Sequence, residues 1–151
     1  MVPECERMKI MSEVKRIFGC SPYRGDVETN LTRAKRYALH IVSRGHCPVL
    51  PHLFFPQFLD DTDWEEREKG IALGVELMKV CHEVWVYGTH ISEGMAYELA
   101  KAKELGIPVR MFDAYCNRID PATLPYDGRV NEDYCNAVRG LKFVQEDREN
   151  V

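Results

Sequence analysis

The sequence lacks the features that mark membrane-spanning, secreted and nucleic-acid-binding proteins. No apolar run approaches the roughly 18–20 residues that cross a bilayer, and the polar segment from Met1 to Met11 has no apolar core like that of a signal peptide. The formal net charge over 151 residues is −4, whereas non-specific binding to a nucleic-acid polymer needs a basic face. We therefore expect a cytoplasmic protein that binds neither a membrane nor a nucleic-acid polymer.

The sequence also lacks a pattern of metal ligands. Its six cysteines form no CxxC pair, and no histidine cluster joins them at zinc-ligand spacing. We expect Cys20, Cys47 and Cys81, which lie in apolar segments, to be small buried side chains in a reducing compartment. The other possible ligands are isolated histidines and one acidic cluster: His52, His82, His90, Asp60, Asp61 and Asp63. None shows ligand spacing, so we expect no metal and no other cofactor.

What the sequence does contain is an alternation of short apolar runs with helical patterns. The expected strands cover residues 17–20, 47–50, 83–87 and 107–112. The expected helices begin near Asp26, Asp63 and Ser92, residues suited to a helix N-terminus. This alternation predicts a flavodoxin-like α/β fold, in which a doubly wound parallel sheet has the strand order 2-1-3-4-5.

The length of the chain favours one domain with a sizeable core. We assign residues 15–145 to this domain, 1–14 to an N-terminal lead-in and 146–151 to a flexible tail. Within the domain we also expect a helix over residues 131–139 and a fifth strand, at the sheet edge, over residues 141–144.

Two polar turns follow strands that are neighbours in this fold. The segment Ser92-Glu93-Gly94-Met95 follows the third strand and opens a helix, and the segment from Ser21 to Asp26 ends the first strand. Backbone N–H groups and a hydroxyl at a helix start bind anions. Because the first and third strands are adjacent, the two turns meet at one edge of the sheet. The sequence therefore predicts a phosphate–sugar site there.

The first turn supplies five expected substrate-binding residues: Ser21, Tyr23, Arg24, Gly25 and Asp26. Gly25 permits close approach of the backbone, and the Arg24 guanidinium offers a charged fork to an oxyanion. An alternative interpretation is a solvated turn in which Arg24 pairs with a surface acid.

The second turn supplies four more substrate-binding residues and the catalytic candidate: Ser92, Glu93, Gly94, Met95 and Glu98. Gly94 lies one turn before Glu98 and leaves space beside it, so the carboxylate is a candidate nucleophile or oxocarbenium stabiliser at a sugar carbon. The alternatives are that Ser92 caps the helix, that Glu93 complements its dipole and that an exposed Glu98 pairs with Lys101 or with another nearby lysine.

An apolar loop separates the second strand from the next helix. Its aromatic residues Phe54, Phe55 and Phe58 suit stacking on a base, packing beneath the helix or contact with a second subunit. The last two together are favoured, and we expect a homodimer.

These motifs resemble those of the nucleoside 2-deoxyribosyltransferase superfamily. The resemblance covers roughly residues 16–112 and is most specific in its second half. There, Ser92-Glu93-Gly94-Met95, Glu98 and the run from Ala102 to Val109 match the pattern of a small uncharacterised branch. The segment from Ser92 to Glu98 also satisfies S-x-G-x-x-Y-E, a motif similar to that of the deoxynucleoside 5′-monophosphate N-glycosidases.

The resemblance implies an N-glycosidase or deoxyribosyltransferase whose ligand is a nucleotide or nucleoside phosphate. It implies that Glu98 is the nucleophile at the anomeric carbon and that Ser92 contacts phosphate, together with Ser21 and Arg24. The alternative function is binding of a nucleotide-derived small molecule without turnover, to sequester or to sense it.

The sequence departs from the superfamily in one region. The helix before the third strand usually carries an Asp near the departing base, but residues 71–76 contain no Asp, and His82 stands where a strand acid is usual. Glu76 or an acid from residues 60–63 could take this place. Because a general acid contributes roughly 10²–10⁴-fold, we expect slow turnover of ordinary deoxynucleoside monophosphates.

Overall fold

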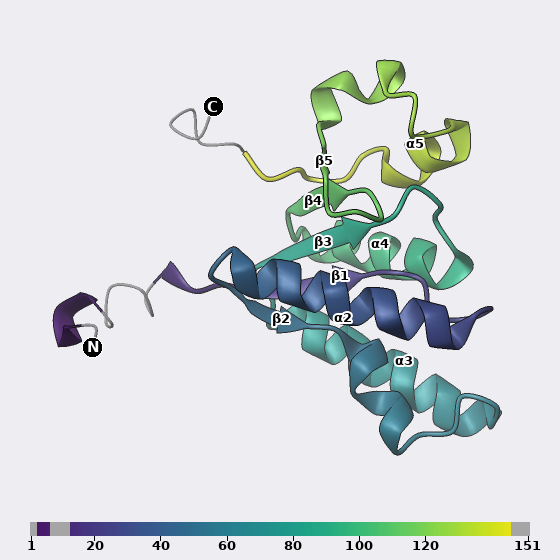
Figure 1. Ribbon diagram of the computed structural model, residues 1–151. Helices are drawn as coiled ribbons and strands as arrows, with labels where there is room; N and C mark the ends of the chain where they lie inside the picture. The colour runs from purple at the N-terminus through teal and green to yellow at the C-terminus, as the bar shows by residue number, and fades with distance from the viewer. Residues whose placement is uncertain (1–2, 7–12, 146–151) are drawn as a thin grey trace.

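The computed structural model describes residues 3–6 and 13–145 (Figure 1). The predicted tail, 146–151, lies outside the described residues, as does most of the predicted lead-in, 1–14. Within the described ranges, helices pack around a central sheet. None of these helices is both long enough and apolar enough to cross a bilayer.

In the described part of the chain, five strands form one sheet in the order β2-β1-β3-β4-β5. They are β1 (Arg16–Cys20), β2 (Cys47–Val49), β3 (Glu83–Tyr87), β4 (Val109–Phe112) and β5 (Arg118–Ile119). β1 pairs in parallel with both β2 and β3, and β3 pairs in parallel with β4. The predicted flavodoxin-like strand order is confirmed, and β1 and β3 lie side by side.

The prediction for the fifth strand is wrong in position and direction. β5, at residues 118–119, runs antiparallel to β4, whereas the segment 141–144 contributes a single parallel bridge to β4. The chain reverses directly after β4 because Asp113 Oδ1 accepts hydrogen bonds from the backbone N–H groups of Tyr115 and Asn117, both at 2.9 Å. So tight a turn permits an antiparallel neighbour but not the long crossover that a parallel one needs.

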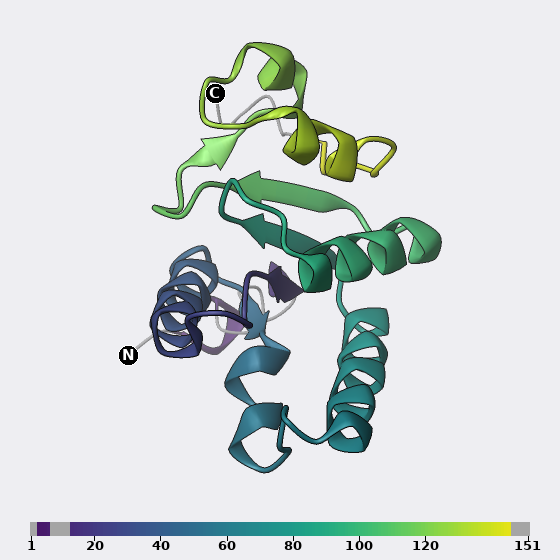
Figure 2. The same ribbon diagram turned by 90° about the vertical axis from the view of Figure 1, so that its right-hand side faces the viewer.

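Helices cover both faces of the sheet, and polar side chains cap their first turns. The α-helices are α2 (Val27–Ser43), α3 (Trp64–Lys79), α4 (Glu93–Leu105) and α5 (Glu132–Val138), and the 3₁₀ turns are η1 (Pro51–Leu53), η2 (Phe55–Gln57) and η3 (Pro121–Tyr126). The capping residues are Asp26, Asp63, Ser92 and Asn131, and each accepts a hydrogen bond from a backbone N–H of the following turn. Figure 2 shows α2 on one face of the sheet and α3 and α4 on the other, which is the predicted doubly wound arrangement.

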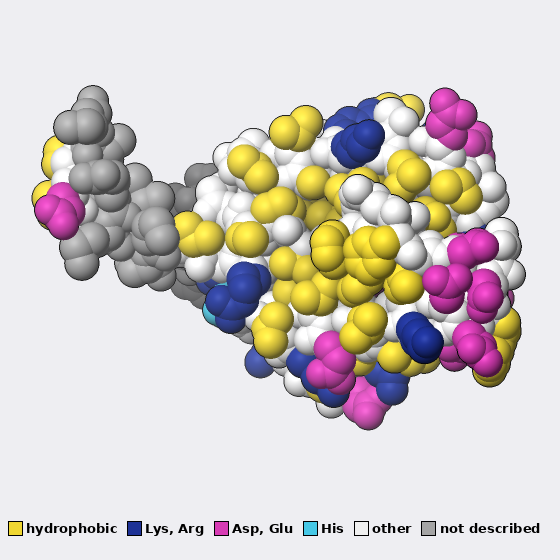
Figure 3. Space-filling model, turned by 90° about the horizontal axis from the view of Figure 1, so that it is seen from below, with side chains coloured by type: hydrophobic (Ala, Val, Ile, Leu, Met, Phe, Trp, Pro, Cys, Tyr) yellow, Lys and Arg dark blue, Asp and Glu magenta, His cyan; other side chains and the backbone are white. Residues whose placement is uncertain are grey.

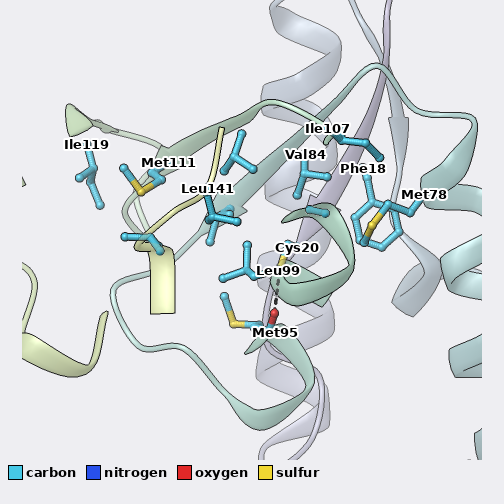
Figure 4. Packing of buried hydrophobic residues seen from close by; sticks show 14 of the residues in the cluster. Phe18, Cys20, Met78, Val84, Met95, Leu99, Ile107, Met111, Ile119 and Leu141 are labelled. Atoms are coloured by element: carbon cyan, nitrogen blue, oxygen red, sulfur yellow. Dashed lines mark hydrogen bonds between the residues drawn. The ribbon is translucent and has the colours of Figure 1, made fainter. Parts of the chain in front are cut away.

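The core divides into two clusters because strand side chains alternate between the two faces. Val84 and Val86 of β3 join the cluster under α3, α4 and α5, whereas Trp85 and Tyr87 join the cluster under α2. Figure 4 shows part of the first cluster, with Cys20 of β1 directed toward α4. The last residue of β1 is thereby brought to the helix that carries Glu98.

The cysteines behave as expected at two of the three positions. Cys20 and Cys81 are buried, but Cys47 is exposed. Cys47 is the first residue of β2, which lies at the edge of the sheet, so its side chain is not covered by a second strand. The expectation of burial at Cys47 is therefore wrong.

Candidate functional site

A cavity of about 780 Å³ lies at the carboxyl ends of β1 and β3, where open α/β sheets bind ligands. Its walls come from the turn after β1, the loop that carries η1 and η2, the helix α3 and the first turns of α4. The volume suits a small molecule, since such sites span roughly 300–1,000 Å³. Nine of the predicted site residues line it: Ser21, Tyr23, Arg24, Gly25, Ser92, Glu93, Gly94, Met95 and Glu98.

Asp26 is the predicted site residue that the structure does not bring to the cavity wall. Its side chain caps α2, because its carboxylate accepts hydrogen bonds from the backbone N–H and the hydroxyl of Thr29, at 3.1 and 2.8 Å. These two hydrogen bonds hold the pKa of Asp26 below its usual value. The carboxylate is thus occupied in starting the helix.

Ser21 and Gly25 form the part of the first turn closest to the sheet. The Ser21 side chain is buried, and its hydroxyl oxygen has no hydrogen-bond partner among the described residues. Gly25 has a φ of 95°, a backbone conformation that glycine adopts without strain. A buried hydroxyl without a partner is costly, so a ligand group that hydrogen-bonds Ser21 would remove this cost.

Two contacts join the first turn to the loop before α3. The ring of Tyr23 stacks on the ring of His52, with centroids 4.9 Å apart and an interplanar angle of 17°. Arg24 Nε lies 3.6 Å from Asp61 Oδ2, which is the surface-acid pairing considered as the alternative role of Arg24. Since the Arg24 side chain is 61 % exposed, this pair is weak and water-accessible, and the guanidinium can turn toward an anion in the cavity.

The second turn places the start of α4 at the cavity. Ser92 Oγ accepts a hydrogen bond from the backbone N–H of Met95 at 3.2 Å, so the predicted capping role of Ser92 is confirmed. A Cβ atom added to Gly94 would meet nothing within 4 Å, which confirms the predicted open space one turn before Glu98. Glu93 is exposed at the rim, in the first turn of the helix.

Glu98 combines enclosure with the lack of a cationic partner. Its side chain is partly exposed to the cavity, and its Oε1 atom lies 3.8 Å from Cys20 Sγ. Lys101 pairs with Glu104 at 3.3 Å instead, so the alternative in which Lys101 neutralises Glu98 is wrong. Burial raises the pKa of Glu98 to about 8, although the hydrogen bond from Cys20 opposes this shift.

On the α3 wall of the cavity, Glu66 and Glu68 near the start of the helix contribute carboxylates, and no residue of 71–76 contributes one. Beyond Glu68, this wall consists of Gly70, Ile71, Gly74, Val75 and Met78. Glu76 lies outside the cavity and pairs with Lys79 at 2.7 Å, with 63 % of its side chain exposed. Glu76 therefore does not replace the missing Asp.

The cavity wall also contains polar residues that were not among the predicted site residues: His52, Asp61, Glu66, Arg67 and Glu68. His52 comes shortly after β2, so the rule that placed the other turns at the carboxyl edge of the sheet also applied to it. Burial lowers the pKa of His52 below its usual value, which favours the neutral ring. Asp61 could not be separated from its acidic neighbours in the sequence, because the difference lies in their hydrogen bonds: Asp60 binds Thr62, and Asp63 caps α3.

The aromatic loop serves the cavity and the surface at once. Phe55 lines the cavity, whereas Phe54 and Phe58 are 56 % and 58 % exposed. The three rings contact one another with centroids 5.1–6.0 Å apart. The loop is therefore a compact aromatic unit with one side toward the ligand space and the other toward solvent.

The fold and the cavity together define a flavodoxin-like α/β domain with a small-molecule site at the carboxyl edge of its sheet. Within that class, residues 15–112 match the model of a family described as a domain of unknown function (DUF7768), and the chain belongs to this family. No curated protein matches the chain.

Two solved structures share the fold at low sequence identity. A 2-deoxyribosyltransferase from Bacillus psychrosaccharolyticus is 18 % identical, with a TM-score of 0.56 over 86 % of this chain and 99 % of that one. A conserved protein from Enterococcus faecalis V583 is 17 % identical, with a TM-score of 0.50 over 91 % of this chain and 94 % of that one. The fold of the protein is thus that of a 2-deoxyribosyltransferase.

Proposed function

We propose that the protein cleaves or transfers the N-glycosidic bond of a nucleotide or nucleoside phosphate, with Glu98 as the nucleophile. The observation that carries this proposal is the position of Glu98, a partly buried carboxyl that lines a cavity between two strand-end turns. The shared fold with a 2-deoxyribosyltransferase supports the same reaction class.

The chemistry needs the ionised form of Glu98. A carboxylate oxygen forms a bond to the anomeric carbon, the carbon–nitrogen bond breaks, and its electron pair leaves with the base. Water or a second base then attacks the anomeric carbon of the glycosyl ester and restores the carboxylate. The departing base takes up a proton, and the acids that line the cavity near the start of α3 are Asp61, Glu66 and Glu68.

The phosphate is assigned to the groups that gather at the two turns. Ser21 offers a buried hydroxyl without a partner, and the first turn of α4 offers backbone N–H groups beside Ser92. The Arg24 guanidinium supplies a positive charge to the phosphate once its weak ion pair with Asp61, at 3.6 Å, is broken. The apolar side chains of Phe55, Ile71 and Met78 form a surface suited to a base.

A second function is binding of the same ligand class without turnover. The α3 wall favours it, because it presents glycine and aliphatic residues where the superfamily enzymes place an acid. Without that acid, base departure lacks an assistance of roughly 10²–10⁴-fold. A binding protein would return its ligand intact, whereas an enzyme releases free base.

The deciding experiment measures free base by chromatography after incubation with a panel of nucleosides and nucleoside 5′-monophosphates. We expect slow release by the parent protein and a loss of several powers of ten in Glu98→Gln, since each 1.4 kcal/mol of barrier is about tenfold. Glu104→Gln is the matched control, because this exposed carboxylate belongs to the same helix, pairs with Lys101 at 3.3 Å and does not line the cavity. Release at the parental rate by Glu98→Gln would overturn the assignment of the nucleophile. Tight binding of a ligand with no release would favour the second function.

A further inference from the structure

We propose that Cys20 is a positioning residue of this site: its thiol donates to Oε1 of Glu98 and leaves Oε2 as the oxygen that meets the ligand. The inference rests on the proposed function for its catalytic meaning, but the contact itself is a property of the folded chain. Nothing in the sequence motifs pointed to Cys20, which we expected to be a plain core residue.

The contact is made where β1 ends against α4. Cys20 is the last residue of β1 and is completely buried. Its Sγ atom lies 3.8 Å from Glu98 Oε1 and 3.9 Å from the carbonyl oxygen of Met95, the latter drawn as a dashed line in Figure 4. Both acceptors belong to α4, one turn apart, so the single thiol proton lies between the helix backbone and the carboxyl of Glu98.

The thiol distinguishes the two oxygens of Glu98. Among the described residues, Cys20 is the one hydrogen-bond donor to this carboxyl, and the donor is at Oε1. Oε2 accepts no hydrogen bond from the described residues. It is also not one of the solvent-inaccessible polar atoms that lack a hydrogen-bond partner, so it keeps some exposed surface. Oε2 is therefore open to the cavity that Glu98 lines, and it is the oxygen available to attack a sugar carbon.

A thiol suits this place better than the alternatives. The cluster to which Cys20 belongs also contains Phe18, Met95 and Leu99, an apolar setting in which cysteine packs as a small hydrophobe. A weak S–H donor can still orient a carboxyl there, and a donor to the charged form favours that form. Alanine would remove the donor, and serine would supply a stronger one in nearly the same volume.

The first test does not depend on turnover. In protein labelled with ¹³C at the glutamate carboxyls, the Glu98 resonance is assigned by its absence in Glu98→Gln and is then titrated with pH. We expect Cys20→Ala to move the titration midpoint upward and Cys20→Ser to move it downward. Cys81→Ala is the matched control, because Cys81 is also buried but its thiol binds the carbonyl of Leu77 at 3.3 Å. We expect no shift in this control.

The second test follows catalysis in the same variants. In the pH profile, kcat/KM should rise with pH as Glu98 ionises, and the midpoint of this rise should shift with the titration midpoint of Glu98 in each variant. In Cys20→Ala, kcat should fall by a larger factor than KM rises, and Cys20→Ser should restore kcat. A midpoint that stays in place in both Cys20 variants, or moves as much in Cys81→Ala, would overturn the proposal. If Cys20→Ala does not fold, the proposal is tested by Cys20→Ser alone, in which the titration midpoint of Glu98 should move downward. A lack of turnover in every variant would contradict the proposed function and leave the titration result standing.

Discussion

Glu98 is unusual among the carboxyls of this chain because it is enclosed and no lysine or arginine of the described part accompanies it. The buried Glu83 gives the contrast: Lys15 and Arg110 lie 2.9 and 3.2 Å from its oxygens, and its pKa is lowered despite burial. The same residue type therefore has opposite pKa shifts at two places in the fold, Glu83 in β3 and Glu98 in α4. Glu83 is a structural anchor, whereas Glu98 keeps an unbalanced carboxyl at a cavity, as candidate catalytic groups do.

The raised pKa of Glu98 predicts a particular dependence of stability on pH. The folded state holds the proton up to about pH 8, whereas the unfolded chain releases it near the ordinary value of 4.5. The contribution of Glu98 to stability is therefore fully present below pH 4.5 and is lost as the pH rises toward 8. Because glutamine does not titrate, Glu98→Gln should gain stability relative to the parent over this range.

The measurement is denaturant unfolding of the parent and of Glu98→Gln at pH 5 and pH 8. The difference between the two proteins should grow with pH, by at most about 1.4 kcal/mol per unit and by less where cavity water reaches the carboxyl. A difference that is constant from pH 5 to 8 would contradict the enclosed state of Glu98.

Arg24 and Asp61 form an ion pair, and substitutions at these two residues should change the affinity for phosphate-bearing ligands in opposite directions. Arg24→Ala should weaken nucleoside monophosphates by roughly 10- to 100-fold and the matching nucleosides far less, because a charge-assisted hydrogen bond contributes about 1.5–3 kcal/mol. Asp61→Asn removes the competing carboxylate at 3.6 Å, so it should tighten the same phosphates by a few-fold, as expected for a surface ion pair.

Titration calorimetry with both ligand series and both variants checks this prediction. Equal losses for nucleosides and monophosphates in Arg24→Ala would mean that Arg24 does not contact phosphate. Weaker phosphate binding in Asp61→Asn would mean that Asp61 holds Arg24 in the binding position instead of competing with the ligand.

At the scale of elements, the sequence predicted the helices and central strands well because their signals are local. Asp26, Ser92 and Asn131 accept hydrogen bonds from the first turns of their helices, and this chemistry depends on residues three positions apart at most. The prediction of the edge strand was wrong because its pairing depends on contacts between residues far apart in the sequence. Strand pairing next to β4 depends on a turn at Asp113 that also binds Arg129, at 3.0 Å and 16 residues away, and no local pattern reveals that contact.

The site followed the same division. The residues of the two turns were predictable because each turn follows a strand directly and parallel strands end at one edge. His52 also follows a strand and could have been found by this rule, but Asp61 could not, since the loop after β2 reaches the cavity through the ring stack of His52 with Tyr23 and the pair of Asp61 with Arg24. These are tertiary contacts between segments about 30 to 40 positions apart in the chain.

Substitution by alanine should lower the stability of the protein at one glycine, Gly19, and raise it at another, Gly74. A Cβ atom on Gly19 of β1 would lie 2.6 Å from Leu50 Cγ, inside the core, so Gly19→Ala should cost about 1–3 kcal/mol by overpacking. A Cβ atom on Gly74 of α3 would make an ordinary contact with Pro51 at 3.6 Å, so Gly74→Ala should gain up to about 1 kcal/mol of helix stability.

Thermal or denaturant unfolding of the two alanine variants decides between these expectations. Because Gly74 also lines the cavity, ligand binding of Gly74→Ala serves as a second readout of how closely α3 approaches the ligand. Stability that is unchanged in Gly19→Ala would show that Leu50 can move aside, and that β1 and the loop after β2 are packed less tightly than described.

At the scale of the molecule, one face is markedly apolar. Figure 3 shows hydrophobic side chains gathered in the middle of this face. The exposed aromatic residues of the loop and of α3, namely Phe54, Phe58 and Trp64, are 56 %, 58 % and 71 % exposed. Apolar surface costs about 25 cal/mol per Å² when it stays in water, and such patches mark association sites. We therefore expect a homodimer that covers this loop.

The dimer would also bear on the cavity, because the loop that presents Phe54 and Phe58 carries Phe55 and Asp61 on its cavity side. We expect light scattering to give a dimer for the parent and a monomer for the double variant Phe54→Gln, Phe58→Gln at the same concentration. Tyr126→Gln is the matched control, since Tyr126 is 90 % exposed on η3, at the opposite end of the molecule in Figure 1. A parent protein that is monomeric at every concentration would contradict the dimer. Retained dimers in the double variant would place the interface on another face, and ligand binding should then be independent of the oligomeric state.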